Sequence, residues 1–207
     1  VNRLRLAKQQ KGSTLNHHLG EPRFLCLLSE LLATKEAVAS KYASIALLCM
    51  LHLRPLGAIL SITRDQVEDD GRNMRIHFTR GSTAESVNVE VARILRFWVA
   101  AWSSPSRSVS KENNPYLFPG LSPNKALDPH AFQAWLKSVH DVTVRQLTAT
   151  GIHVMISRGM ISPAALVDQY GWSHATALRY WNDSGQISNE PFRAFSQRII
   201  QMNVEGS

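Results

Sequence analysis

The fold class of this chain depends on residues 74–91, MRIHFTRGSTAESVNVEV. Apolar and polar side chains alternate along residues 74–78 and again along residues 87–91. Alternation with a period of two is typical of half-buried β-strands. A loop-like connection that contains Gly81 joins the two runs. The stretch therefore predicts a β-hairpin.

The chain on both sides of this hairpin has helical spacing, with apolar residues recurring every three and four positions. Helices are expected at residues 21–32, 34–53, 56–61, 91–102, 129–139, 144–158, 162–170, 174–182 and 190–202. Helices, one hairpin and then more helices predict a mainly α domain with a small antiparallel β-sheet (α+β). This order differs from the strand–helix alternation that builds a parallel-sheet nucleotide fold.

Length and composition favour one large domain, with or without an added arm. The chain has 207 residues, of which 44% are hydrophobic, and this is enough to bury a core. Its net charge is +7 and its pI is about 9.8. An excess of positive charge favours a polyanionic partner, because each neutralised phosphate releases condensed counterions.

The first twenty residues carry much of this positive charge. Arg3, Arg5, Lys8 and Lys11 occur there, and no acidic residue precedes Glu21. We interpret residues 1–20 as a linker or arm that follows a phosphate backbone, with a solvated tail as the alternative. Residues 21–207 form the expected main domain.

Several enzyme classes lack their motifs in this sequence. There is no phosphate-binding glycine loop, no dinucleotide-binding GxGxxG, no zinc-protease HExxH and no paired CxxC. We therefore expect no metal and no cofactor. Cys26 and Cys49 fall in apolar helical patterns, which predicts buried thiols in a reducing, intracellular compartment. No apolar run is long enough for a membrane span.

Five short motifs stand out because of their order around the hairpin. The first is Leu51-His52-Leu53-Arg54-Pro55 followed by Asp65, and the second is Arg80-Gly81 in the hairpin turn. The third is Tyr116-Leu117-Phe118-Pro119, and the fourth begins Arg145-Gln146-Leu147-Thr148. The fifth runs from Gly171-Trp172-Ser173-His174 to Tyr180. None of the five is specific alone, and their order is the stronger signal.

Together these motifs resemble the catalytic domain of tyrosine recombinases of the phage-integrase type, over about residues 20–200. The resemblance implies an enzyme that cuts and rejoins DNA through a phosphotyrosyl intermediate, without a metal. In such a reaction a tyrosine attacks a phosphodiester, and arginines stabilise the negative charge on the nonbridging oxygens. It further implies a site-specific recombinase or integrase of a mobile element.

The resemblance assigns a role to several residues of this chain. Arg54 matches the first arginine, with a surface arginine near a helix end as the alternative. Tyr180 matches the nucleophile or a former nucleophile, with packing or hydrogen bonding as the alternative. Trp172 matches a position where an indole N–H donates to the phosphate, and its alternative is a core tryptophan. Arg80 matches the catalytic lysine of the hairpin. Phosphate contact is the safer role for Arg80, because arginine stays protonated and is a poor general acid.

The fourth motif departs from the family pattern. Arg145 and Thr148 occupy the places of a His or Lys and of the second arginine. Thr148 cannot offer a guanidinium fork, and Arg145, one helical turn earlier, is the available substitute. The acid expected three residues after Arg54 is replaced by Gly57, and Trp181 stands at the strictly spaced nucleophile position.

Three hypotheses remain open: an active recombinase, a catalytically degraded DNA-binding module of the same fold, and an unrelated helical interaction domain. The first two imply double-stranded DNA as partner and a location with the nucleoid or in the nucleus. They also imply a further DNA-binding domain before residue 1. The helix at residues 190–202 would dock on a second copy in a homo-oligomer on DNA, or alternatively on its own core.

Overall fold

The computed structural model describes residues 18–79, 81–102, 114–157, 161–168, 170 and 172–185 of the chain. Within these residues the chain forms helices α2 to α9 and one antiparallel sheet of three short strands. The predicted fold class, mainly α with a small antiparallel sheet, is confirmed. None of the described helices is long and apolar enough to cross a membrane.

The elements follow one another in the expected order. They are α2 (Glu21–Leu32), α3 (Ala37–Leu51), α4 (Leu56–Leu60), a 3-10 turn (Arg64–Gln66), β1 (Val67–Asp69), β2 (Met74–Ile76), β3 (Glu85–Ser86), α5 (Val89–Trp102), α6 (Pro129–His140), α7 (Val144–Ser157), α8 (Pro163–Asp168) and α9 (His174–Gly185).

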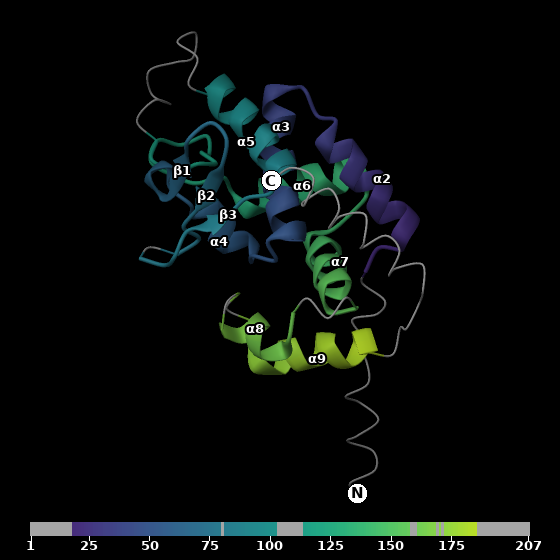
Figure 1. The fold of residues 1–207 in the computed structure, drawn as a ribbon. Helices are drawn as coiled ribbons and strands as arrows, with labels where there is room; N and C mark the ends of the chain where they lie inside the picture. The colour runs from purple at the N-terminus through teal and green to yellow at the C-terminus, as the bar shows by residue number, and fades with distance from the viewer. Residues whose placement is uncertain are drawn as a thin grey trace, which may run out of the picture.

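Helix α3 is the central element of the fold. The Glu36 carboxylate caps its start by accepting hydrogen bonds from the backbone N–H groups of Val38 and Ala39. Residues 43–50 are all buried, because this stretch, ASIALLCM, is apolar on every side except for Ser44. Helices α2, α5, α6 and α7 pack around it (Figure 1).

The apolar interior consists of two clusters. The larger one joins α2, α3, α5 and α6 with the sheet. The smaller one joins α7, α8 and α9, and Leu53, just after α3, is the member that comes from the first half of the chain. In Figure 1, α8 and α9 lie apart from the main body, and α7 lies between the main body and these two helices. Leu53 therefore connects the last helices to the end of α3.

The sheet has the order β1-β2-β3, and both pairs are antiparallel. Val67 pairs with Ile76 in the first ladder, and Glu85 pairs with Ile76 in the second. The expected β2 is confirmed. Strand β1 was not expected from the sequence, because only Val67 among its three residues is apolar.

The expected second strand of the hairpin, residues 87–91, is wrong in position. The strand is Glu85–Ser86, and helix α5 begins at Val89. The Asn88 side chain accepts a hydrogen bond from the Glu90 backbone N–H at 2.9 Å, as a residue that starts a helix does. The alternation of valines therefore spans a strand end and the first turn of a helix.

The two cysteines differ in their surroundings. Cys49 is buried in α3, as expected. Cys26 is exposed, so its expected burial is wrong. Its thiol donates a hydrogen bond to the Glu30 carboxylate at 3.0 Å, one turn further along α2. Other apolar residues near Cys26 in the sequence occupy the side of α2 that faces the core.

Helices α3 and α7 approach each other closely at Gly151. A Cβ atom at this position would lie 2.2 Å from the Met50 carbonyl oxygen and 2.9 Å from a methyl group of Leu53. The first of these atoms belongs to the backbone, so it cannot move aside alone. The absence of a side chain at Gly151 therefore allows α7 to rest on the end of α3.

We expect Gly151→Ala to destabilise the protein by roughly 1 to 3 kcal/mol, because the added methyl group overpacks a backbone contact. Gly57→Ala is the matched control. Gly57 lies in α4 with open space around its Cα, so alanine there should be neutral or mildly stabilising. Urea unfolding of both variants measures the difference. Equal free energies of unfolding would contradict the close approach of α3 and α7.

Candidate functional site

Arg54 lies at a sharp corner between α3 and α4. Helix α3 ends at Leu51, and Leu53 adopts a left-handed backbone conformation with φ of 50°. A β-carbon makes this conformation unfavourable, so the surrounding packing must hold it. Pro55 follows Arg54 and disfavours helical backbone before it. The sequence thus sets Arg54 outside both helices, beside the buried Leu53.

The Arg54 side chain is almost completely enclosed. The residue is only 8% exposed, and its guanidinium carbon lies 4.8 Å from the ring centres of both Phe78 and Tyr170. One terminal nitrogen forms an ion pair with the Glu85 carboxylate. Burial lowers the pKa of Arg54 from its ordinary value, and Tyr170 partly offsets this. Cation–π contacts and a carboxylate therefore compensate the desolvation of the charge.

Sequence reasoning did not find the residues that surround Arg54. Phe78 and Glu85 come from the hairpin, and Tyr170 comes from the segment between α8 and α9. The acid that was sought three residues after Arg54, where Gly57 stands, comes instead from β3. No local spacing links residues 54 and 85, so only the cross-strand register, with Glu85 opposite Ile76, brings this carboxylate to Arg54.

Trp172 joins the Arg54 corner to α9. Its indole N–H donates a hydrogen bond to the Leu53 carbonyl oxygen at 3.3 Å. The Tyr180 ring meets the Trp172 ring edge-on, with 6.1 Å between the ring centres. Tyr180 is 6% exposed and belongs to the same apolar cluster as Leu53. The first and fifth motifs of the sequence are therefore next to each other.

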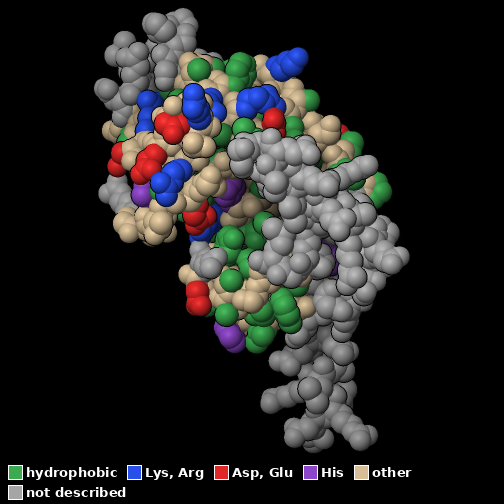
Figure 2. All heavy atoms as spheres, viewed as in Figure 1, with side chains coloured by type: hydrophobic (Ala, Val, Ile, Leu, Met, Phe, Trp, Pro, Cys, Tyr) green, Lys and Arg blue, Asp and Glu red, His purple; other side chains and the backbone are tan. Residues whose placement is uncertain are grey.

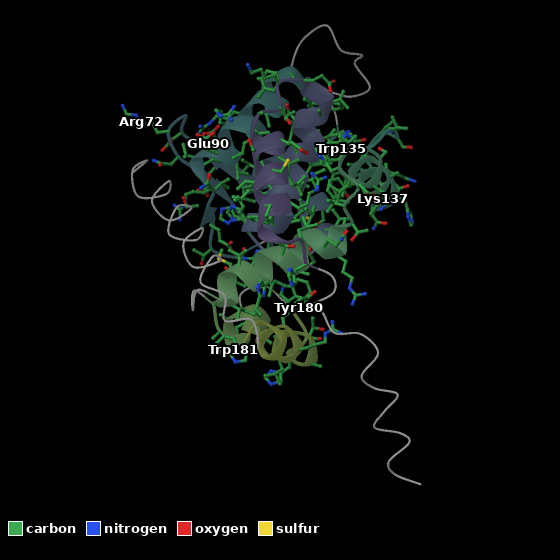
Figure 3. The ribbon with its side chains drawn as sticks, turned by 90° about the vertical axis from the view of Figure 1, so that its right-hand side faces the viewer. Arg72, Glu90, Trp135, Lys137, Tyr180 and Trp181 are labelled. Atoms are coloured by element: carbon green, nitrogen blue, oxygen red, sulfur yellow. The ribbon has the colours of Figure 1, made fainter. Side chains whose placement is uncertain are left out.

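Tyr180 and Trp181 point in different directions from α9. Figure 3 shows Tyr180 on the side of α9 that faces α7, and Trp181 on the outer side. Trp181 is 38% exposed, in contrast to the buried Tyr180. Tyr180, not Trp181, is thus the aromatic residue of α9 that packs in the apolar cluster containing Leu53.

The fourth motif lies on α7. Thr148 is 6% exposed, and its hydroxyl donates a hydrogen bond to the Val144 carbonyl oxygen at 3.1 Å within the same helix. Arg145 is exposed in the first turn of α7. It lies about 9 Å along the helix axis from Gly151, where α7 touches the Arg54 corner.

The remaining expected site residues lie outside the described residues. These are Arg80 in the hairpin turn and the basic residues Arg3, Arg5, Lys8 and Lys11. The helix expected at residues 190–202 also lies outside them. Their predicted roles stay predictions.

Figure 2 shows a hollow between the main body and the α8–α9 unit, with hydrophobic side chains beside it. On the same face, basic and acidic side chains alternate over the sheet and α5. One example is the ion pair between Arg96 and Asp69, at 2.7 Å. Among the described residues, no group of three His, Cys, Asp or Glu side chains is arranged to hold a metal ion.

The fold has counterparts among solved structures. No protein-family model and no curated protein matches the sequence. The site-specific recombinase XerH, bound to palindromic difH in a post-cleavage complex, is similar with a TM-score of 0.60 and 13% identity, over 83% of this chain and 51% of XerH. The pre-cleavage complex of XerH gives a TM-score of 0.56 and 12% identity, over 79% and 49%.

The fold is that of a tyrosine recombinase catalytic domain. At 12–13% identity the likeness concerns the fold alone, and this chain spans about half the length of the XerH chains. Within this recombinase fold, the Arg54 corner and Tyr180 come together as neighbours of Leu53 and Trp172.

Two histidines, the half-buried His52 and the buried His153, make the stability of this recombinase fold depend on pH. Burial lowers the pKa of His52 to about 4, and the Arg54 charge adds to this effect. Burial also lowers the pKa of His153 to about 4, and His18, stacked on it at 4.9 Å, adds to it. An unfolded histidine titrates near 6.5. Between pH 6.5 and 4 the native protein thus binds fewer protons, and stability is lost as the pH falls.

We expect His153→Gln to flatten this loss, since each histidine contributes roughly 3 kcal/mol over the window. Urea unfolding of the wild type and the variant from pH 7 to pH 4 measures the two profiles. The carboxylates are shared by both proteins, so their titration cancels in the difference. Parallel profiles would mean that His153 accepts a proton freely in the native state.

Proposed function

We propose that this chain binds double-stranded DNA and breaks and rejoins it through a phosphotyrosyl intermediate on Tyr180. The observation that carries the proposal is the link from Arg54 through the Leu53 carbonyl and Trp172 to Tyr180. A cation and a phenol that are 126 positions apart in sequence are thus connected through two intervening residues, Leu53 and Trp172. A phosphodiester needs both groups, one for charge stabilisation and one for attack.

The chemistry of the reaction assigns a task to each residue. The Tyr180 phenol attacks phosphorus and loses its proton, while the bond to the 5′ oxygen breaks and that oxygen takes up a proton. Arg54 stabilises the charge on a nonbridging oxygen, and the Trp172 N–H adds a neutral donor once it leaves the Leu53 carbonyl. Arg80 contributes a phosphate contact from the hairpin.

A second candidate is a DNA-binding module of the same fold without strand cleavage. Thr148 favours it, because a buried hydroxyl that is bonded within its own helix replaces the second arginine. Loss of one preorganised hydrogen-bond donor to the transition state reduces rates by roughly 100- to 1000-fold in other enzymes. Arg145 would have to swing along α7 to compensate for Thr148.

Trapping on nicked DNA separates the two candidates. A duplex selected for binding from a random library, nicked so that the cleaved end diffuses away, should form a covalent adduct with the wild type. Tyr180→Phe should abolish the adduct and retain duplex binding, because only the nucleophilic oxygen is removed. Trp181→Phe, the adjacent matched control, should keep it. Duplex binding by the wild type without any adduct establishes the second candidate instead.

The basic segment at the start of the chain should contribute to duplex affinity through counterion release. Replacement of Arg3, Arg5, Lys8 and Lys11 by Gln should reduce the slope of log affinity against log salt by about 3 to 4, at roughly 0.9 per phosphate contact. Fluorescence anisotropy with a labelled duplex at several salt concentrations measures it. An unchanged slope would show that this segment is a solvated tail.

In this proposal the helix at residues 190–202 docks on a second copy, and the active form is a homo-oligomer assembled on DNA. A further DNA-binding domain before residue 1 would grip the duplex from the opposite side.

A further inference from the structure

The Arg54 guanidinium is reached from solvent past a carboxylate. Only 10% of the Arg54 side chain is exposed, compared with 38% of the Glu85 side chain with which it pairs. The rings of Phe78 and Tyr170 lie against the guanidinium as well. Glu85 is therefore the more solvent-accessible member of the pair, and the Arg54 guanidinium is covered by Glu85 together with the two rings.

A carboxylate and a phosphate bind a guanidinium in the same way, through hydrogen bonds from its N–H groups to two or more oxygens. Glu85 thus already supplies Arg54 with the kind of ligand that a DNA backbone would supply. As long as the Glu85 carboxylate remains there, it occupies the N–H groups of Arg54 and neutralises the guanidinium charge. Two anions cannot share one edge of a guanidinium without strong mutual repulsion.

We propose that Glu85 is an internal occupant of an anion site on Arg54, and that a DNA phosphate binds there by displacing it. The proposal deepens the proposed DNA-binding function and rests on it for the identity of the ligand. The exchange of one anion for another can be tested without DNA.

The strand that carries Glu85 is suited to such an exchange. Strand β3 has two residues, lies at the edge of the sheet, and is held to β2 by the pairs Arg75 with Ser86 and Ile76 with Glu85. So short an edge strand has little stability of its own. Glu85 can therefore leave Arg54 without disruption of the main core, which is built mainly on the helices.

The register of the sheet also provides a matched control. Glu85 lies opposite Ile76, and Glu68 lies opposite Arg75 on the other face of the sheet. Glu68 is exposed and pairs with His77 at 2.8 Å, away from Arg54. Glu85→Gln and Glu68→Gln hence change the net charge equally, and only the first removes the carboxylate from Arg54.

The first experiment measures binding of inorganic phosphate through the unfolding temperature, with chloride exchanged for phosphate at constant ionic strength. Glu85→Gln should bind phosphate about tenfold more tightly than the wild type. Glu68→Gln should match the wild type. The double variant Arg54→Gln with Glu85→Gln, which leaves no buried unpaired charge, should lose the gain.

Two results would overturn the proposal. One is an equal phosphate affinity for Glu85→Gln and Glu68→Gln, which would mean that net charge alone acts. The other is a gain that survives in the double variant, which would place the anion away from Arg54. If Glu85→Gln fails to fold, Glu85→Asp replaces it, because a carboxylate one methylene shorter should release Arg54 partly and give a smaller gain.

A second readout, affinity for a labelled duplex, separates this proposal from the proposed function. Tighter phosphate binding by Glu85→Gln without any duplex binding by any variant supports the anion site and contradicts the DNA function. The opposite outcome is duplex binding and a Tyr180 adduct, while Glu85→Gln binds neither phosphate nor the duplex more tightly than Glu68→Gln. That outcome supports the DNA function and contradicts displacement of Glu85.

Discussion

The buried positive charge of Arg54 is the constraint around which the other elements are arranged. An arginine that is 8% exposed needs compensation for its lost hydration, and here it comes from two segments distant in the sequence. The hairpin supplies Phe78 and Glu85, and the segment before α9 supplies Tyr170. Removal of any of these partners would leave charge less compensated in a nearly dry site. Arg54 therefore links the hairpin to the last helices as well as serving as a candidate phosphate ligand.

Structural and chemical roles compete at this residue. A clamp for a phosphodiester should present its N–H groups to the ligand, and Arg54 has one terminal nitrogen engaged by a carboxylate. Catalytic groups in unliganded enzymes often reach their working geometry only when substrate binds. In the proposed mechanism Trp172 would follow the same pattern, because its N–H is bonded to the Leu53 carbonyl in this structure. Both donors are thus bonded within the protein itself.

Sequence reasoning found the architecture and the approximate bounds of most helices, because apolar spacing reports which face of a helix is buried. It predicted α7 within one residue of its end, and it singled out as site candidates Trp172 and Tyr180, whose rings contact each other. It misplaced the second hairpin strand, since valine alternation continued into the first turn of α5. It also missed Glu85, because the replacement of the expected acid by Gly57 gave no hint of where another carboxylate would come from.

The sequence by itself determined the order of helices and hairpin, the excess of positive charge and the residue types available for chemistry. These follow from local periodicity and composition, which neighbouring residues largely decide. Only the tertiary structure decided that Tyr180 rather than Trp181 packs in the cluster with Leu53, and that Glu85 pairs with Arg54. Both depend on contacts between segments far apart in the chain, through the rotation of α9 and the register of β3 on β2, and neither leaves a local pattern in the sequence.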